Sequence, residues 1–374
     1  MKRKIQIRIR QVLTVGVVLA LTLTSCTGPQ PAAAPASGGA ITMRVGYFPN
    51  ITHSQALVGV ARGDFQKAVG SNVILDVKTF NAGPSVIEAM FAGQLDLSYI
   101  GPNPSINGYV QSKGEALRVI AGATSAGAAF IVRPDANITK PEDLDGKKLA
   151  SPQLGNTQDV ALRAYIVAHS LKTKEKGGTV EVIPTDNAQI LDLFKQGKID
   201  GAWVPEPWAS RLIVDGGGKL FLDERDLWPG GDFVTANIIV STKFLNEHPD
   251  LVKAWLKAHV EVTQWELANP DQAKKTANDE IKRLTGKALS DQVLDSAWTR
   301  MKITYDPEGD VLYIQLREET PTDSIDIEEG VTAELDSQGH LVAMEVLDAS
   351  QRLTAEELTN VSYENLLLAS TPQR

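Results

Sequence analysis

Short apolar runs alternate with amphipathic stretches over most of the chain, from about residue 41 to residue 298. Runs such as "MRVGYF" and "LDLSYIG" have the length of buried strands, while "NAQILDLFKQG" carries apolar residues at helical spacing. Strands and helices that take turns along a sequence are typical of α/β domains with mostly parallel sheets. After residue 249 the pattern predicts helices alone, over residues 249–270 and 289–301.

The pattern changes near Met301, where helical spacing gives way to alternating apolar and polar positions. Turn residues at 307–310 follow the first such segment, and further strand candidates continue to about residue 350. This change predicts a small β-rich C-terminal domain over residues 301–350 and a helix or tail over residues 351–374. The expected fold class is therefore α/β, followed by a small β-rich domain.

Two segments of the α/β region are similar to each other. "AGQLDLSYIGPNP" and "QGKIDGAWVPEPW" start 104 residues apart, and each contains a glycine, an aspartate, a strand and a proline-containing loop. The matched positions are Gly93 and Gly197, Asp96 and Asp200, and Tyr99 and Trp203. Either all α/β units look alike in this way, or the chain folds into two similar lobes. In open α/β sheets ligands bind beyond the carboxyl ends of the strands, so two such lobes would face a common cleft.

The first 40 residues differ from the rest in charge and bulk. Five of the first ten are basic, an apolar run follows, and the first acidic residue is Asp64. This order predicts a secretory signal. The residues "LTSC" resemble the bacterial lipobox, in which Cys26 is lipidated and becomes the mature N-terminus; the alternative is an ordinary signal peptide with a chance cysteine. We expect a lipoprotein signal peptide over residues 1–26 and a flexible tether over residues 27–41.

Composition narrows the class of protein. The 374 residues suit two or three domains, and the net charge of −9 argues against nucleic acid as a partner. Cys26 is the single cysteine, and the five histidines lack metal-ligand spacing. Motifs of nucleophilic hydrolases, zinc proteases and nucleotide-binding loops do not occur in the sequence. The sequence thus shows no catalytic arrangement, and we expect no enzyme activity, no cofactor and no metal.

Four segments of the α/β region resemble one family. They are "VGYFPNITHSQALVGVARGDF", "FNAGPSVIEAMFAGQLDLSYIGPNPSINGY", "KPEDLDGKKLASPQLGNTQDVALRAYI" and "DGAWVPEPWASRLI". Their sequence and order resemble the nitrate, sulfonate and taurine type of periplasmic binding proteins of ABC importers, and the related proteins that bind a thiamine-precursor pyrimidine. The resemblance implies a bilobal periplasmic-binding-protein fold of type II over residues 42–300. Lobe 1 would span about residues 42–125 and 235–300, and lobe 2 about residues 126–234.

The C-terminal region resembles a different family. Residues 301–350 resemble a short bacterial domain of unknown function, typified by "YDPEGDVLYI". The resemblance implies that two domains are fused near Met301, and it carries no function for the second one.

The first resemblance also implies where a ligand binds. In that family the segment matching "SPQLGNTQD" contacts the ligand's oxyanion, and a helix start supplies free N–H groups there; the same residues would also serve as an ordinary helix cap. Glu206 would suit a ligand amine, pair with a cation or be solvated. Aromatic residues at the strand ends would wall the cleft or belong to the core. The predicted ligand-binding residues are Tyr47, His53, Pro102, Asn103, Gly155, Asn156, Thr157, Gln158, Trp203, Glu206 and Thr235.

The function implied is capture of a small anionic solute, such as an alkanesulfonate, taurine or nitrate, by lobe closure. The solute would pass to an ABC permease and ATPase complex. The protein is expected to be monomeric, extracytoplasmic and anchored to the bacterial cell membrane by lipidated Cys26. The alternatives are a binding protein for a thiamine-precursor pyrimidine and an enzyme on the same fold.

Overall fold

The structure is a computed structural model, and it describes residues 40–303, 312–315, 321–328 and 331–346. The predicted signal peptide, nearly all of the predicted tether and the predicted C-terminal helix or tail lie outside these residues. Within the described part of the chain, helices with the length and apolarity needed to cross a membrane are absent.

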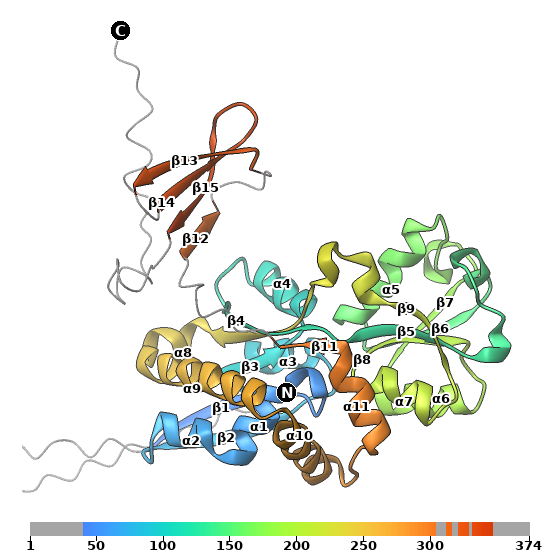
Figure 1. Ribbon diagram of the computed structural model, residues 1–374, viewed down its shortest axis with the longest axis horizontal. Helices are drawn as coiled ribbons and strands as arrows, with labels where there is room; N and C mark the ends of the chain where they lie inside the picture. The colour runs from blue at the N-terminus through green and yellow to red at the C-terminus, as the bar shows by residue number, and fades with distance from the viewer. Residues whose placement is uncertain (1–39, 304–311, 316–320, 329–330, 347–374) are drawn as a thin grey trace, which may run out of the picture. The chain divides into compact units, whose positions relative to one another are not determined.

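The first lobe is built on a six-stranded sheet with the order β11-β4-β10-β3-β1-β2 (Figure 1). Strands β1 and β2 run parallel, as do β1 and β3, while β10 runs antiparallel to both of its neighbours. The strands are β1 (Ile41–Tyr47), β2 (Val73–Thr79), β3 (Leu97–Ile100), β4 (Leu117–Ala126), β10 (Val234–Ser241) and β11 (Met301–Lys302). The helices that accompany this sheet in the chain are α1 (Ser54–Arg62), α2 (Asp64–Val69), α3 (Gly83–Phe91), α4 (Pro102–Gln111), α8 (Thr242–Glu247), α9 (Pro249–Ala268), α10 (Pro270–Thr285) and α11 (Asp291–Arg300).

The second lobe has a five-stranded sheet with the order β7-β6-β8-β5-β9. Its first three strands in that order are parallel, and β5 runs antiparallel to β8. The strands are β5 (Ala128–Val132), β6 (Lys148–Pro152), β7 (Glu181–Thr185), β8 (Gly201–Pro205) and β9 (Lys219–Asp223). The helices are α5 (Thr157–Ala168), α6 (Asn187–Lys195) and α7 (Trp208–Val214). Short 3-10 turns complete the two lobes at η1 (Ile51–His53), η2 (Pro134–Ala136), η3 (Pro141–Leu144), η4 (Lys174–Lys176), η5 (Glu224–Leu227) and η6 (Pro229–Gly231).

The internal similarity seen in the sequence corresponds to equivalent structure. Asp96 accepts a hydrogen bond from the backbone N–H of Arg44 at 2.8 Å, and Asp200 accepts one from the backbone N–H of Lys148 at 2.8 Å. Gly93 and Gly197 both have positive φ, 67° and 68°, where a side chain would be strained. Each aspartate therefore ties the start of its own strand to the neighbouring parallel strand, β3 to β1 and β8 to β6, and the two lobes repeat one plan.

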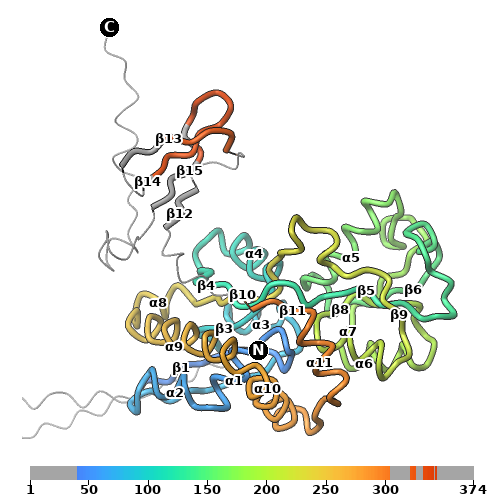
Figure 2. Tube along the Cα trace, viewed as in Figure 1, coloured from blue at the N-terminus to red at the C-terminus, as the bar shows by residue number. Residues whose placement is uncertain are grey.

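The chain passes between the lobes at two places, which Figure 2 lets the reader follow. The first passage runs from β4 to β5 through Gly127, whose φ of +82° turns the chain. The second runs from η5 through η6 to β10. Strand β11 pairs with the end of β4, Met301 opposite Ala126, so the last strand of the first lobe lies beside the first passage.

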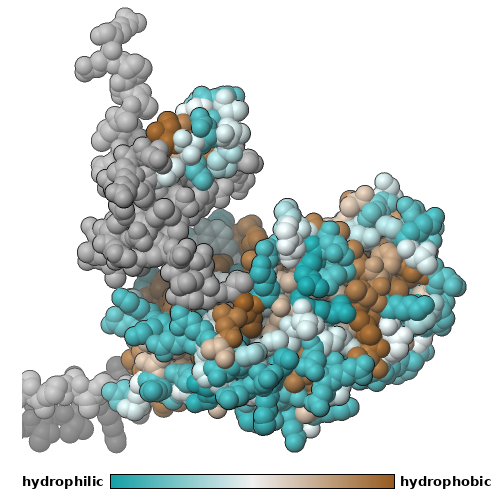
Figure 3. Space-filling model, in the orientation of Figure 1, coloured by the Kyte–Doolittle hydropathy of each residue, from teal (hydrophilic) through white to brown (hydrophobic). Residues whose placement is uncertain are grey.

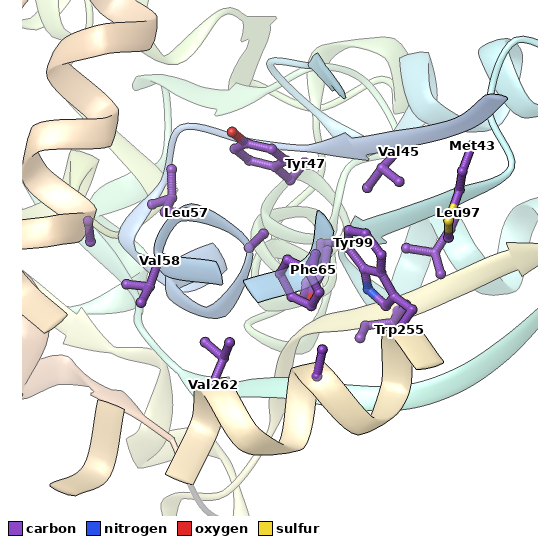
Figure 4. Close-up of a cluster of buried hydrophobic side chains, with 14 of the residues drawn as sticks. Met43, Val45, Tyr47, Leu57, Val58, Phe65, Leu97, Tyr99, Trp255 and Val262 are labelled. Carbon is purple, nitrogen blue, oxygen red and sulfur yellow. The ribbon is translucent and has the colours of Figure 1, made fainter. Parts of the chain in front are cut away.

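The first lobe has a large apolar core between its sheet and the helices α1, α2 and α9. Phe65 stacks on Trp255 with ring centroids 3.9 Å apart, and both side chains are fully buried (Figure 4). The second lobe has two apolar clusters, one with Phe194 and one with Trp203. Hydrophilic residues cover most of the visible face of the lobes, with apolar patches between them (Figure 3).

The C-terminal region forms a separate four-stranded antiparallel sheet with the order β12-β15-β14-β13. Its strands are β12 (Leu312–Gln315), β13 (Asp323–Glu328), β14 (Val331–Leu335) and β15 (Leu341–Val346). The change of pattern near Met301 therefore marks a change from an α/β region to an all-strand sheet among the described residues.

Candidate ligand-binding site between the lobes

A small cavity of about 20 Å³ lies between the two lobes. The first lobe contributes the turn before α1, the loop before α3, the N-cap of α4 and β10. The second lobe contributes the starts of α5 and α6 and the end of β8. The lining residues are Phe48, Asn50, Thr52, His53, Asn81, Gly101, Asn156, Thr157, Gln158, Asn187, Pro205 and Thr235. The cavity thus lies at the carboxyl ends of parallel strands in both sheets, where open α/β sheets bind ligands.

Helix N-termini from both lobes converge on this cavity. Gly101 is the N-cap of α4 and Asn156 is the N-cap of α5, and neither helix start has a side-chain cap hydrogen bond. The first backbone N–H groups of a helix lack partners within the helix, and the helix dipole adds positive potential at that end. In α4, Pro102 and Pro104 have no N–H, so the free N–H groups at this cavity come mainly from α5. Together with the dipoles of both helices, they favour a negatively charged group.

Thr157, the first residue of α5, lies against the N-cap of α4 in the other lobe. Its side chain is buried, and its Oγ1 has no hydrogen-bond partner within the protein. A Cβ added to Gly101 would collide with that Oγ1, so only glycine lets α4 and α5 approach as they do. The hydroxyl of Thr157 can therefore donate a hydrogen bond to a ligand, in addition to the backbone N–H groups.

A buried carboxylate holds the start of α5 in place from behind. Asp159 accepts hydrogen bonds from the Ser151 hydroxyl at 2.6 Å, the Gly155 N–H at 2.9 Å and Arg163 Nε at 3.0 Å. The loop between β6 and α5 is therefore fixed by its own helix, and the charge of Asp159 is used within the second lobe.

His53 lines the cavity as a neutral ring. Its Nδ1 accepts a hydrogen bond from the Phe48 N–H at 3.3 Å, so the proton of the neutral ring lies on Nε2. Burial lowers the pKa of His53 to about 3. The twelve lining residues include no lysine, arginine, aspartate or glutamate. The cavity therefore offers dipoles and neutral hydrogen-bonding groups to a ligand, without a formal charge.

Four hydrogen bonds connect the lobes around the cavity. In two of them Trp208 Nε1 donates to Asn50 Oδ1 at 3.0 Å, and Asn81 Nδ2 donates to Asp186 Oδ1 at 2.6 Å. The other two lie at the start of α3: the Gly83 N–H donates to Asn156 Oδ1 at 3.2 Å, and Ser85 Oγ donates to Gln153 Oε1 at 3.2 Å. These bonds hold the lobes in a closed arrangement.

The structure divides the predicted ligand-binding residues into two groups. His53, Asn156, Thr157, Gln158 and Thr235 line the cavity. Pro102, Asn103, Gly155, Tyr47, Trp203 and Glu206 do not. Pro102 and Asn103 belong to the first turn of α4, and Gly155 lies before α5 with its N–H bonded to Asp159.

Tyr47 and Trp203 are core residues and do not wall the cleft. Both side chains are fully buried. The hydroxyl of Tyr47 donates to Glu280 at 2.9 Å, and Nε1 of Trp203 donates to Glu224 at 2.8 Å. From the sequence, aromatic residues near strand ends could belong either to the core or to the cleft. In the structure, the polar atom of each of these two residues bonds to a carboxylate of its own lobe.

Glu206 is directed toward α11, away from the cavity. Its carboxylate accepts hydrogen bonds from the Ser210 N–H and hydroxyl, both at 3.0 Å, and lies 3.3 Å from Arg300 Nε. The side chain is fully buried, and burial raises its pKa to about 7. Of the alternatives open for Glu206, the structure supports pairing with a cation.

Sequence reasoning missed Asn81 and Asn187. Asn81 follows strand β2, and Asn187 follows strand β7 as the first residue of α6. The sequence pattern could have indicated them, because both asparagines follow a predicted strand and stand next to a helix start, where open α/β sheets bind ligands.

Comparison with known proteins identifies the class. Residues 38–279 match the model of the NMT1-like family, so the chain belongs to this family. It is 29% identical to the taurine-binding periplasmic protein of Escherichia coli (strain K12), over 61% of this chain and 69% of that protein. It is 27% identical to a putative aliphatic sulfonates-binding protein of Bacillus subtilis (strain 168), over 63% of this chain and 69% of that protein.

Solved structures show the same fold. The alkanesulfonate-binding protein SsuA from Xanthomonas axonopodis pv. citri, bound to MOPS, superposes with a TM-score of 0.59 at 18% identity. The match covers 73% of this chain and 86% of that one. The predicted α/β fold of the periplasmic-binding-protein type is thereby confirmed. At the C-terminus, residues 302–350 match a family described as protein of unknown function (DUF2283), which confirms the second resemblance.

The lobe approach at Gly101 leads to a first prediction. Gly101→Ala places a methyl group against Thr157 Oγ1 and should keep the lobes from closing. Small-angle scattering should then show a larger radius of gyration than for the wild type. Gly122→Ala is the matched control, because a Cβ there meets no atom within 4 Å. Equal scattering curves for the Gly101 variant and the wild type would contradict this account of closure.

A second buried carboxylate supports the turn that carries His53. Glu266 of α9 accepts a hydrogen bond from the Ser54 hydroxyl at 2.9 Å, while its Oε1 has no partner within the protein. Burial raises its pKa from 4.5 to about 8. The native state thus holds this proton more tightly than the unfolded chain does. The contribution of Glu266 to the free energy of unfolding is therefore fully present below pH ~4.5 and is lost as the pH rises through about 8.

The second prediction follows from that linkage. Glu266→Gln keeps an acceptor for Ser54 and cannot ionise. Between pH 5 and pH 8 the wild type should lose on the order of a few kcal/mol more unfolding free energy than the variant. Denaturant unfolding at both pH values measures the difference. Glu261→Gln, at an exposed position of the same helix, should keep the wild-type pH profile. Parallel profiles for Glu266→Gln and the wild type would contradict the assignment.

Proposed function

We propose that the protein is the solute-binding component of an ABC importer and captures a small anion, such as an alkanesulfonate, taurine or nitrate, by closure of its lobes. The observation that carries the proposal is the small cavity at which the N-termini of α4 and α5 meet, with the unpartnered hydroxyl of Thr157 between them. A hydroxyl and free backbone N–H groups can replace the hydration of an anion without a permanent countercharge.

The family and its named members support the same class. A taurine-binding periplasmic protein and putative aliphatic sulfonates-binding proteins are among the relatives, and a nitrate-binding protein is among those that share the fold. The proposed contacts of the anionic group are Thr157 Oγ1, the first N–H groups of α5 and His53 Nε2–H. Asn156, Gln158 and Thr235 complete the polar wall.

The alternative ligand, a thiamine-precursor pyrimidine, is a larger planar molecule. The closed cavity of about 20 Å³ exceeds only slightly the ~10–15 Å³ that one water-sized group needs. A compact headgroup therefore requires less opening of the lobes than a heterocycle. We also propose that this protein binds and delivers its ligand unchanged, as a monomer, to a permease and ATPase complex.

Calorimetric titration tests the proposed function. We expect saturable binding of a sulfonate or of nitrate, and weaker or no binding of an aminomethyl-pyrimidine. Thr157→Val removes one hydrogen bond to a charged group while keeping the shape. It should weaken anion binding roughly 10- to 150-fold. Thr276→Val in α10, away from the cavity, is the control. Binding of the pyrimidine alone would favour the alternative function.

The location proposed for the protein rests on the sequence of its first residues. We propose that Cys26 is lipidated and anchors the protein outside the cytoplasm, with residues 27–41 as the tether. Cys26→Ser should release the protein from the membrane fraction or leave it unprocessed. Fractionation and mass spectrometry of the N-terminus measure both effects. If the variant remains as membrane-bound as the wild type and is cut at the same position, the lipid anchor is refuted.

A further inference from the structure

A second set of contacts joins the lobes at α11, away from the cavity. Ala297 of this helix belongs to the apolar core of the first lobe, and Leu212 of α7 belongs to the apolar core of the second lobe. Between the two helices, the hydroxyls of Ser210 and Ser296 share a hydrogen bond at 2.8 Å. The junction of α7 and α11 is therefore a direct contact between the lobes.

A buried ion pair fixes the same junction at the C-terminal end of α11. Arg300 Nε lies 3.3 Å from the carboxylate of Glu206, which is fully buried. The backbone N–H of Glu206 also donates to the carbonyl of Gly127 at 2.8 Å, in the first passage between the lobes. At the start of the second passage, the carboxylate of Asp223 lies 3.9 Å from Arg300 Nη1. Arg300 therefore lies where the two passages between the lobes come together.

The two helices stand apart at the other end of α11. Ser290 and Val293, at the N-terminal end of this helix, line a groove of about 620 Å³ that is also lined by Arg211 of α7. The helices thus touch through Ser296 and Arg300 and are separated by the groove near Ser290. Contact at one end and separation at the other leave room for the lobes to rotate about the Arg300 end.

The two sets of contacts between the lobes differ in what it costs to break them. The hydrogen bond between Asn81 and Asp186 beside the cavity is exposed, so water replaces it when the lobes part. Separating Glu206 from Arg300 leaves a buried carboxylate without its cation, which is strongly destabilising in proteins. The contacts around the cavity are therefore the ones that give way first.

We infer that the junction of α7 and α11 is the pivot of lobe closure: Arg300 and Ser296 stay bound to Glu206 and Ser210 in the open and the closed state, while the contacts around the cavity break and form. This inference rests on the closure contained in the proposed function and adds the axis of that motion. Arg300 is a positioning residue, because it acts on the cavity only through the orientation of the lobes. The C-terminal sheet follows α11 and β11 in the chain, so it is attached next to the pivot.

Two cross-links distinguish a pivot from a contact that opens. In the full chain carrying Cys26→Ser, Ser210→Cys with Ser296→Cys can form a disulfide, since the two hydroxyl oxygens are already 2.8 Å apart. Calorimetry should then give a dissociation constant for taurine within about threefold of that of the reduced form. Asn81→Cys with Asp186→Cys, joined by a short cross-linker, is the matched control. It should lose taurine binding, because the lobes can no longer open.

The rate of disulfide formation measures how firmly Arg300 holds the junction. That rate should be equal with and without taurine, because the contact persists in both states. Arg300→Met should slow it about tenfold, the lower end for a hydrogen bond to a charged group, whereas Arg300→Lys retains a cation for Glu206. Arg283→Met is the control, because Arg283 pairs with Glu280 within the first lobe. An unchanged rate in Arg300→Met would contradict the role of Arg300.

Small-angle scattering of Gly101→Ala tests the pivot without a ligand, because the added methyl group meets Thr157 and keeps the lobes apart. The larger radius of gyration of this variant should persist when the cysteines at positions 210 and 296 are linked. A return to the wild-type radius on oxidation would overturn the inference, as would loss of taurine binding in the linked protein. If neither taurine nor nitrate binds to the wild type, the proposed function fails, and the scattering alone decides whether the junction is a pivot.

Discussion

The closed arrangement depends on bringing two helix N-termini of like sign together. The N-cap of α4 lies against the first residue of α5, so closely that Gly101 has no room for a side chain. Each helix end is equivalent to about half a positive charge. Their approach is unfavourable unless something negative lies between them. A negative group between the two helix ends, as proposed for the ligand, would relieve this repulsion, so the proposed anion binding and the closed arrangement would support each other.

The neutrality of the cavity is as important as its dipoles. The nearby buried carboxylates are engaged elsewhere: Asp159 with Arg163 and Glu206 with Arg300. They stabilise loops and helix packing without placing a charge in the cavity. In the proposed function an anion meets groups that need no countercharge, and the candidates for selecting between ligands are the buried polar atoms of the cavity that are left without partners. Those atoms are Thr157 Oγ1 and Asn187 Oδ1.

Local patterns predicted the fold well because they act over short stretches of the chain. The matched Gly93 and Gly197, and Asp96 and Asp200, revealed the repeated plan of the lobes, since both are needed for the same turn and strand in each lobe. The start of α5 was also predicted, because a helix start is readable from a few residues.

The rest of the site depends on contacts between distant parts of the chain. Whether Glu206 meets a ligand or Arg300, 94 residues later, is decided by how α11 packs against α7. Asn81 and Asn187 meet one cavity only because both sheets direct their carboxyl ends toward it. Tyr47 could not be assigned to the core from the sequence for the same reason, because its hydrogen-bond partner Glu280 lies far along the chain, on α10.

Closure without a ligand is stabilised by little. The four cross-lobe hydrogen bonds around the cavity each contribute about 0.5–1.5 kcal/mol, and the exposed one between Asn81 and Asp186 competes with solvent. Such a balance lets a ligand shift the population by binding the closed form more tightly than the open one. Strand β11 pairs with the end of β4, next to Gly127, where the chain first passes to the second lobe. The C-terminal sheet follows β11 in the chain and is therefore attached to the binding region beside the passage between its lobes. The cavity, formed by strand ends and helix starts of the two lobes, is lined by no described residue of that sheet.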